Sequence, residues 1–279
     1  MARLFSPESL TPPASPARQE RFPWEPESVK RANLVTAAVR QLLLQKIPAQ
    51  GVHAQSLLVA AGALVGFAAQ NSALEQGELL TRRRDLVAPE SLMLRLDQEG
   101  RRFLAGRWVN APLLLGYGHG FPLQRFVVQA AAKAGVKRTE FPDYWELERK
   151  VAKAAAEGDL ERLEATQERG ALARPQDLLR VLWPSARRVL TAPMPLDLAD
   201  EPVLNEAHWP IALAVVAARL MTQTAKIVDP TVGASLVMEA AIIASKLDPD
   251  VADRGRWTLG PAPRGLQIAR DDRRRRVVA

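Results

Sequence analysis

The five residues Gly116, Tyr117, Gly118, His119 and Gly120 form the segment of this chain best suited to chemistry. Glycines let the backbone approach a ligand closely and adopt positive φ angles. The phenol of Tyr117 and the imidazole of His119 can both transfer protons. This loop is therefore the leading candidate for a small-ligand site or an active site.

Two interpretations of the loop fit the residues around it. Leu113–Leu115 before it and a helix from Pro122 after it would give a strand, a loop and a helix, a layout that can bind phosphate at the amino end of the helix. The spacing is G-x-G-x-G, however, and not the G-x-G-x-x-G of dinucleotide-binding proteins. The glycines suit equally well a plain turn that follows a short helix capped by Asn110.

His208 is a second candidate ligand-binding residue, because Glu206 stands two positions before it. A metal site needs three or four converging ligands, and the chain has no cysteine, only three histidines and no H-E-x-x-H pattern. The sequence therefore predicts no metal and no cofactor. The other interpretation of His208 is structural: it begins a helix, with Trp209 packed beneath it. Neither a nucleophile elbow nor a Walker loop is present, so whether the chain is an enzyme stays open.

Arg219 and Glu239 are lone charges in two apolar segments joined at Val228–Pro230. If these segments form antiparallel helices with the turn near residue 229, the two side chains lie opposite each other. A buried carboxylate is costly without hydrogen bonds, and a guanidinium can donate two. The pattern predicts a structural ion pair between Arg219 and Glu239. The alternative is that each residue faces solvent from opposite sides.

The net charge of +7 is concentrated at the carboxyl end of the chain. Residues 264–279 hold six arginines and two aspartates, which accounts for +4 of it. Short basic runs are weak signals, and no aromatic residues are interleaved to stack on bases. We therefore expect a solvated tail, and binding of nucleic acid is unlikely.

Composition and patterning predict a soluble, cytoplasmic protein. Hydrophobic residues make up 47% of the 279 positions, enough for a packed core. The absence of cysteine fits a reducing compartment, and no secretory signal pattern is visible in residues 1–13. The longest apolar run, residues 57–69, is shorter than the roughly 20 residues that a membrane span needs. We expect no association with a membrane.

Helical patterns dominate the chain. One begins near Lys30, with apolar residues every three or four positions from Leu34 to Leu43 and with Thr36 facing away. The other expected helices cover residues 54–74, 143–157, 159–169, and 175 to the break or kink at Pro184. Residues 92–109 alternate with a period of two around a turn, which predicts a β-hairpin.

The predicted fold class is mainly α. An extended, proline-rich arm (1–29) precedes a helical, bundle-like domain (30–255), which contains the small inserted β-hairpin (92–109) and an αα-hairpin (210–246). A flexible basic tail (256–279) follows.

Three classes of function remain. The first is a non-catalytic helical protein that self-associates or binds a protein partner, because its alanine-rich helices are apolar on nearly all sides. The second is an enzyme or small-ligand-binding protein with its site at Gly116–Gly120. The third is weak nucleic-acid binding through the arginine tail.

Overall fold

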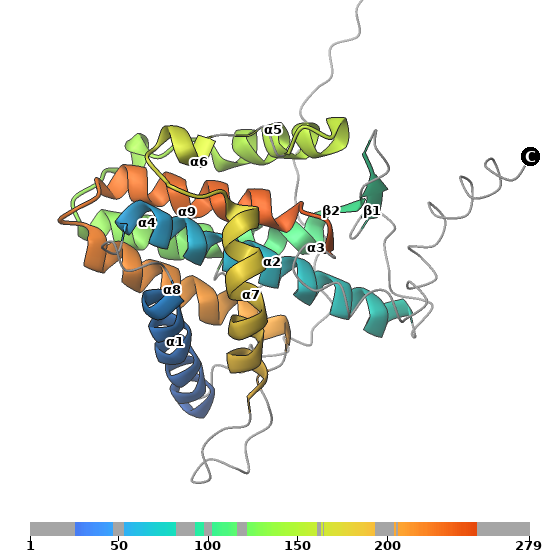
Figure 1. The fold of residues 1–279 in the computed structure, drawn as a ribbon, viewed down its shortest axis with the longest axis horizontal. Helices are drawn as coiled ribbons and strands as arrows, with labels where there is room; N and C mark the ends of the chain where they lie inside the picture. The colour runs from blue at the N-terminus through green and yellow to red at the C-terminus, as the bar shows by residue number, and fades with distance from the viewer. Residues whose placement is uncertain are drawn as a thin grey trace, which may run out of the picture.

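The structure is a computed structural model, and it describes residues 26–46, 53–81, 93–97, 102–115, 122–160, 163, 165–192, 204 and 206–249. Within these ranges the protein is mainly α, as predicted, with a single two-stranded sheet. Figure 1 shows the helices gathered around a central pair, α2 and α9. The predicted arm and tail lie mostly outside the described residues, but residues 26–29, which were expected to belong to the arm, are helical.

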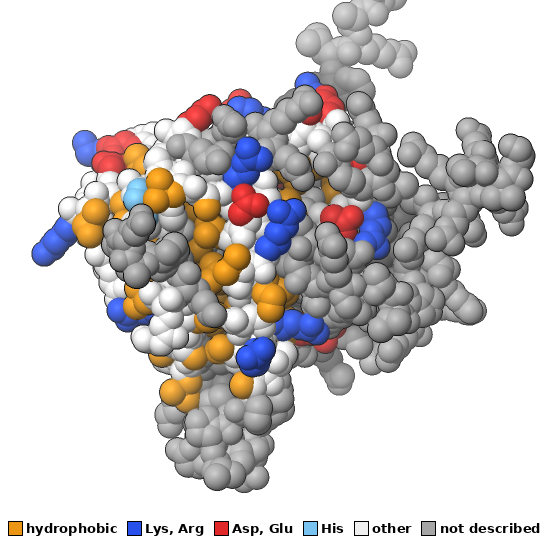
Figure 2. All heavy atoms as spheres, in the orientation of Figure 1, with side chains coloured by type: hydrophobic (Ala, Val, Ile, Leu, Met, Phe, Trp, Pro, Cys, Tyr) orange, Lys and Arg blue, Asp and Glu red, His pale blue; other side chains and the backbone are white. Residues whose placement is uncertain are grey.

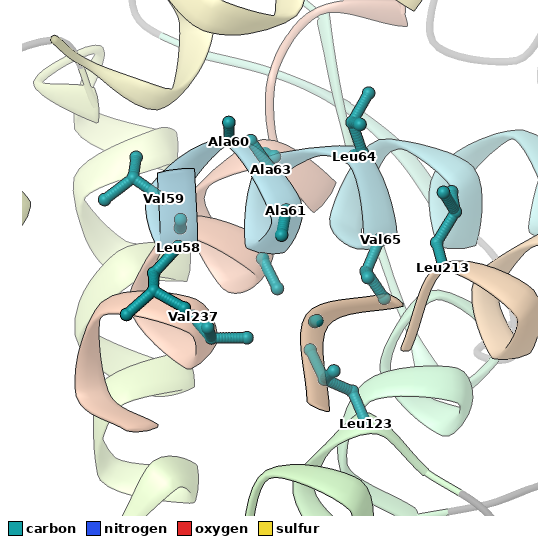
Figure 3. Packing of buried hydrophobic residues seen from close by; sticks show 14 of the residues in the cluster. Leu58, Val59, Ala60, Ala61, Ala63, Leu64, Val65, Leu123, Leu213 and Val237 are labelled. Carbon is teal, nitrogen blue, oxygen red and sulfur yellow. The ribbon is translucent and has the colours of Figure 1, made fainter. Parts of the chain in front are cut away.

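Helix α2 (Ala54–Thr81) is the centre of the core. His53 caps its amino end, because its Nδ1 atom accepts a hydrogen bond from the Ser56 backbone N–H at 3.4 Å. Figure 3 shows side chains leaving the helix on opposite sides, with Leu58 and Val65 projecting to one side and Leu64 to the other. These side chains are buried almost completely, so α2 is surrounded by the rest of the protein.

By length and composition alone, residues Ala54–Glu75 of α2 could cross a membrane. The most apolar window of this segment is wholly buried inside the protein, and a core helix has the same composition. The burial therefore accounts for the apolar character of α2 without a lipid environment.

Helix α9 (Pro230–Ser245) runs parallel to α2 and packs closely against it. A β-carbon added to Gly62 would overlap the backbone carbonyl of Val237, and one added to Gly66 would overlap that of Ala241. One turn further along, the Gln70 side chain donates to the carbonyl oxygen of Ser245, 175 residues away in the sequence, at 3.3 Å. Contacts that recur every four residues are typical of helices whose i±4 ridges interlock.

Helix α8 (Trp209–Thr224) leads into α9 through the turn that the sequence predicts. The Asp229 carboxylate accepts hydrogen bonds from the backbone N–H groups of Thr231 (2.8 Å) and Val232 (3.1 Å), and Pro230 is the first helical residue. The two helices then diverge, and both pack mainly on α2 rather than on each other (Figure 1). The αα-hairpin is therefore present, but its helices do not form a tightly paired unit.

Three amphipathic helices pack around the central pair: α4 (Leu123–Lys133), α5 (Tyr144–Glu157) and α7 (Pro175–Thr191). Helix α1 (Pro26–Lys46) packs mainly on α8 and α7. The indole of Trp183 on α7 meets the ring of Phe67 on α2 edge-on, with centroids 4.9 Å apart. It meets the indole of Trp209 on α8 at 6.0 Å. Edge-to-face geometry is the arrangement that aromatic pairs prefer, and here it joins three helices.

The β-hairpin is confirmed but is shorter than predicted. Strands β1 (Met93–Leu96) and β2 (Arg102–Ala105) pair antiparallel, with Leu94 opposite Leu104 and Arg95 opposite Phe103. After Gly106, which has a φ of 115°, the chain turns into the short helix α3 (Arg107–Asn110). Trp108 therefore belongs to a helix and not to the second strand.

Several predicted helix limits and one predicted face were wrong. Helix α1 begins at Pro26 rather than near Lys30, and Thr36 is buried on it while Leu34 is exposed. Helix α6 covers only Ala165–Glu168 of the predicted 159–169. Helix α7 continues past Pro184, which is exposed. The hydrogen bond that this proline removes is thus lost on the solvent side, where water can replace it.

The close approach of α2 and α9 predicts opposite effects for two glycine-to-alanine changes. Gly66→Ala should lower the free energy of unfolding by about 2–3 kcal/mol, because its methyl group meets rigid backbone. Gly233→Ala, on α9, should be neutral or stabilising by up to about 1 kcal/mol, because its methyl group would lie 3.4 Å from a Leu58 methyl group and alanine favours the helix. Urea unfolding of both variants tests this, and equal effects would contradict the proposed packing.

Candidate functional site

The Gly116–Gly120 loop, with Tyr117, Gly118 and His119, lies outside the described residues. The segments on either side of it are described, and they exclude one of the two interpretations. Residues Ala111–Leu115 form a π-helical turn instead of a strand, so the strand–loop–helix layout expected for phosphate binding is wrong. A short helix does precede the loop, as the plain-turn interpretation requires.

His208 ends a 3₁₀ turn (Glu206–His208) at the amino end of α8. The side chain is half-buried, and burial lowers the pKa of its imidazole. Beneath it the Trp209 indole is buried and donates to the Leu204 carbonyl oxygen at 3.1 Å. No three His, Asp or Glu side chains of the described residues lie close enough to hold a metal ion. His208 therefore stands at the start of α8 next to the buried Trp209, and its role as a ligand-binding residue stays a prediction.

The predicted ion pair between Arg219 and Glu239 is wrong. The Arg219 guanidinium is exposed and donates to Asn33 Oδ1 of α1 at 2.8 Å. Glu239 is buried, and its carboxylate accepts from Nε of Arg169 at 3.1 and 3.3 Å. The prediction failed because α8 and α9 diverge, so residues at equal distances from their turn do not face each other.

Glu239 and Tyr144 are buried and form a polar cluster with Arg169, whose side chain is partly exposed to solvent. Burial raises the pKa of the Glu239 carboxyl group, while Arg169 beside it acts in the opposite direction. Burial, with a contribution from the Glu239 charge, also raises the pKa of the Tyr144 phenol. The Tyr144 hydroxyl is buried without a hydrogen-bond partner among the described residues. The cluster joins α5 and the segment after α6 to the middle of α9.

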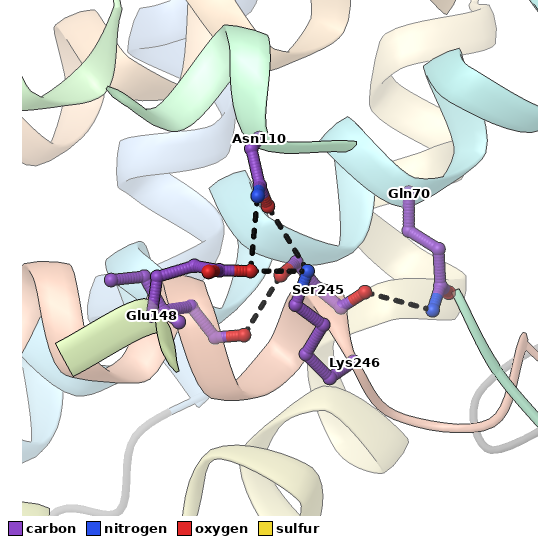
Figure 4. A network of polar contacts seen from close by, with 6 residues as sticks. Gln70, Asn110, Glu148, Ser245 and Lys246 are labelled. Atoms are coloured by element: carbon purple, nitrogen blue, oxygen red, sulfur yellow. Dashed lines mark hydrogen bonds and ion pairs between the residues drawn. The ribbon is translucent and has the colours of Figure 1, made fainter. Parts of the chain in front are cut away.

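A second polar cluster lies at the carboxyl end of α9 and centres on Lys246 (Figure 4). The Lys246 side chain is fully buried, and its Nζ atom lies 3.1 Å from Glu148 Oε1 on α5 and 3.0 Å from Asn110 Oδ1. Asn110 in turn donates to the same Glu148 oxygen at 3.0 Å. Burial lowers the pKa of the Lys246 ammonium, whereas the Glu148 charge raises it.

Neighbouring interactions extend this cluster in two directions. On one side, Gln70 of α2 donates to the Leu247 carbonyl oxygen at 2.6 Å, which fixes the chain as it leaves α9. On the other side, the Asp248 carboxylate accepts from the backbone N–H of Arg102 (3.3 Å) and from its guanidinium (3.2 Å). The β-hairpin is thereby attached to the end of α9.

A small hollow of about 80 Å³ opens beside this cluster. Its walls come from the β-hairpin, the carboxyl end of α5, the amino end of α7 and the chain just after α9. Lys246 contributes to the wall, but its ammonium group is fully enclosed by its own partners. The lysine therefore has a structural role in the wall. The other lining residues are the ones that present polar groups to the hollow.

Few local signals in the sequence indicate these two clusters. Lys246 and Glu239 are visible as isolated charges in an apolar helix, which marks them as residues that need partners. The partners Glu148, Asn110 and Arg169 lie 70 to 136 residues away or in weakly patterned segments, and no local spacing connects them. No family model, curated protein or solved structure matches the chain.

Removing Lys246 should be much more costly than removing an exposed lysine of α5. Lys246→Met leaves Glu148 with a partly desolvated, unpaired carboxylate and should lower the free energy of unfolding by about 3–5 kcal/mol. Lys153→Met breaks an exposed pair with Glu157 and should cost at most about 1 kcal/mol. Urea unfolding compares them. Adding Glu148→Gln to Lys246→Met should restore part of the lost free energy of unfolding, because it removes the unpaired carboxylate. If nothing is restored, Lys246 does not stabilise the protein through its pair with Glu148.

The buried carboxyl group of Glu239 should make stability depend on pH. Its pKa is raised in the folded protein, so its contribution to stability is complete below the ordinary value of 4.5 and is lost as pH rises through the folded value. Glu239→Gln should remove this loss. The test is the difference in unfolding free energy between the wild type and the variant across pH 4–8.

In that experiment Glu157→Gln is the matched control, because Glu157 is an exposed glutamate on α5. The difference in unfolding free energy is measured between the wild type and each of the two variants. If Glu239→Gln and Glu157→Gln gave the same difference at every pH, burial of Glu239 would have no consequence for stability.

Proposed function

We propose that this protein is a non-catalytic helical binding protein that associates with a second copy of itself. The observation that carries the proposal is the exposure of two large apolar side chains at one end of the α2–α9 pair. Leu172 is 76% exposed and Ile227 is 77% exposed. Single exposed apolar residues are common on proteins, but grouped ones favour a binding surface.

Both residues are tied to the amino ends of the central helices. The Leu172 backbone N–H donates to Ser56 Oγ in the first turn of α2 at 3.0 Å. Ile227 lies in the turn before α9, where the neighbouring Val228 is buried near Gly233. The core therefore fixes the backbone at or next to both residues, which lowers the entropy cost of presenting them to a partner.

The charges beside Ile227 favour a second copy as the partner. Lys226 and Asp229 are both exposed and lie on either side of it. In a two-fold dimer each residue meets the same patch of the other subunit, so Lys226 of one copy can approach Asp229 of the other in both directions. Figure 2 shows hydrophobic side chains spread from this end of the molecule across the face in view, with Lys and Arg set among them.

The setting of this function follows from the sequence. We propose a cytoplasmic, soluble chain without a cofactor, because a chain that lacks cysteine fits a reducing compartment. We do not propose nucleic acid as a partner, since +4 of the net charge of +7 lies in residues 264–279, outside the described residues. Ligand binding at Gly116–Gly120 stays the alternative proposal.

Sedimentation analysis at increasing protein concentration tests the proposal. The wild type should dimerise, and the double variant Leu172→Glu/Ile227→Glu should be monomeric with an unchanged melting temperature, because both side chains are exposed. Gln223→Glu, at an exposed position of α8, is the control and should dimerise. A wild type that stays monomeric up to several hundred micromolar, or a double variant that dimerises equally well, would contradict the proposal.

A further inference from the structure

The hollow beside the Lys246 cluster is assembled from four separate parts of the chain. Phe103 of β2, Ala155 of α5 and Leu247 form apolar parts of its wall. A cavity needs about 10–15 Å³ to hold one water molecule, so 80 Å³ accommodates on the order of five waters or a small organic molecule of similar size. The hollow is independent of the surface proposed above for self-association.

Gln176 is the residue that points to a ligand in this hollow. It is only 6% exposed, lines the hollow, and has no side-chain hydrogen-bond partner among the described residues. Its carboxamide is not among the fully buried polar groups that lack a partner, so its donors and acceptor keep contact with solvent. A ligand in the hollow can exchange hydrogen bonds with Gln176 in place of water.

The amino end of α7 adds a preference for negative charge. Gln176 is the second residue of this 17-residue helix, whose dipole places partial positive charge there. Arg180, one turn later on the same side of the helix, also lines the hollow. Among the described residues its guanidinium pairs with Asp177 at 3.2 Å, and exposed pairs of this kind are weak enough to exchange for a ligand.

Other parts of the wall carry negative charge. Asp97, at the end of β1, and Asp248, after α9, both line the hollow, and both already interact with other residues of the protein, Asp248 with Arg102. A simple anion would meet repulsion from these carboxylates, and a simple cation would meet repulsion from Arg180 and Arg102. The lining is therefore suited to a molecule that carries both charges.

We infer that this hollow binds a small zwitterion of the amino-acid type. The carboxylate of the ligand accepts hydrogen bonds from the Gln176 carboxamide and the Arg180 guanidinium at the amino end of α7. Its ammonium group donates to the carboxylates of Asp97 and Asp248. A short side chain contacts the apolar wall at Phe103 and Leu247. The small volume restricts the ligand to the smaller amino acids.

Calorimetric titration of the full chain with glycine, L-alanine and L-serine tests this inference. At least one of them should bind saturably, and propionate and ethylamine, which each carry one of the two charges, should bind at least tenfold more weakly. Gln176→Leu and Arg180→Ala should each weaken binding at least tenfold. Arg180 is exposed, so its variant should fold even if the Gln176 variant does not. Gln223→Ala is the control and should bind as the wild type does.

Three results would overturn the inference. The first is the absence of saturable binding for all three amino acids. The second is equal binding of propionate or ethylamine, which would show that the two charges are not read together. The third is unchanged affinity in Arg180→Ala, which would place any binding elsewhere on the protein.

Discussion

The close backbone contact between α2 and α9 is the constraint on which the rest of the structure depends. Gly62 and Gly66 remove the side chains that would hold the helices apart, so the backbone of α9 at Val237 and Ala241 lies directly against α2. Two helices that touch this closely share one core. The remaining helices pack around the pair, and this explains why α2 is apolar on every side.

The two ends of this central pair differ in chemistry. At the amino ends, Leu172 and Ile227 present apolar side chains to solvent. At the carboxyl end of α9, the contact between the two helices ends at polar groups. Gln70 of α2 donates to the chain leaving α9, and Lys246 pairs with Glu148. The apolar end is suited to another protein surface, and the polar end, with its hollow, is suited to a small ligand. One rigid unit thus positions both proposed sites.

Local signals in the sequence predicted local structure well and long-range contacts poorly. The helices near 54–74 and 143–157 and the turn at Val228–Pro230 follow from neighbouring residues, and the structure has all of them. The partner of Glu239 did not follow, because Arg169 comes from a polar segment with no periodic pattern. The face of α1 was also misjudged, since tertiary packing buries Thr36, which donates to the Ala212 carbonyl oxygen at 3.4 Å. The hollow could not be predicted, because its four walls are joined only by the fold.

The parallel arrangement of α2 and α9 is most directly tested by distances between spin labels. The chain has no cysteine, so labels attach only at introduced sites. Thr231 at the start of α9 should lie near Gln55 at the start of α2, and should be farther from Gln76 by roughly 30 Å, because α2 rises about 1.5 Å per residue. A Thr231 label closer to Gln76 than to Gln55, or equally far from both, would contradict the account.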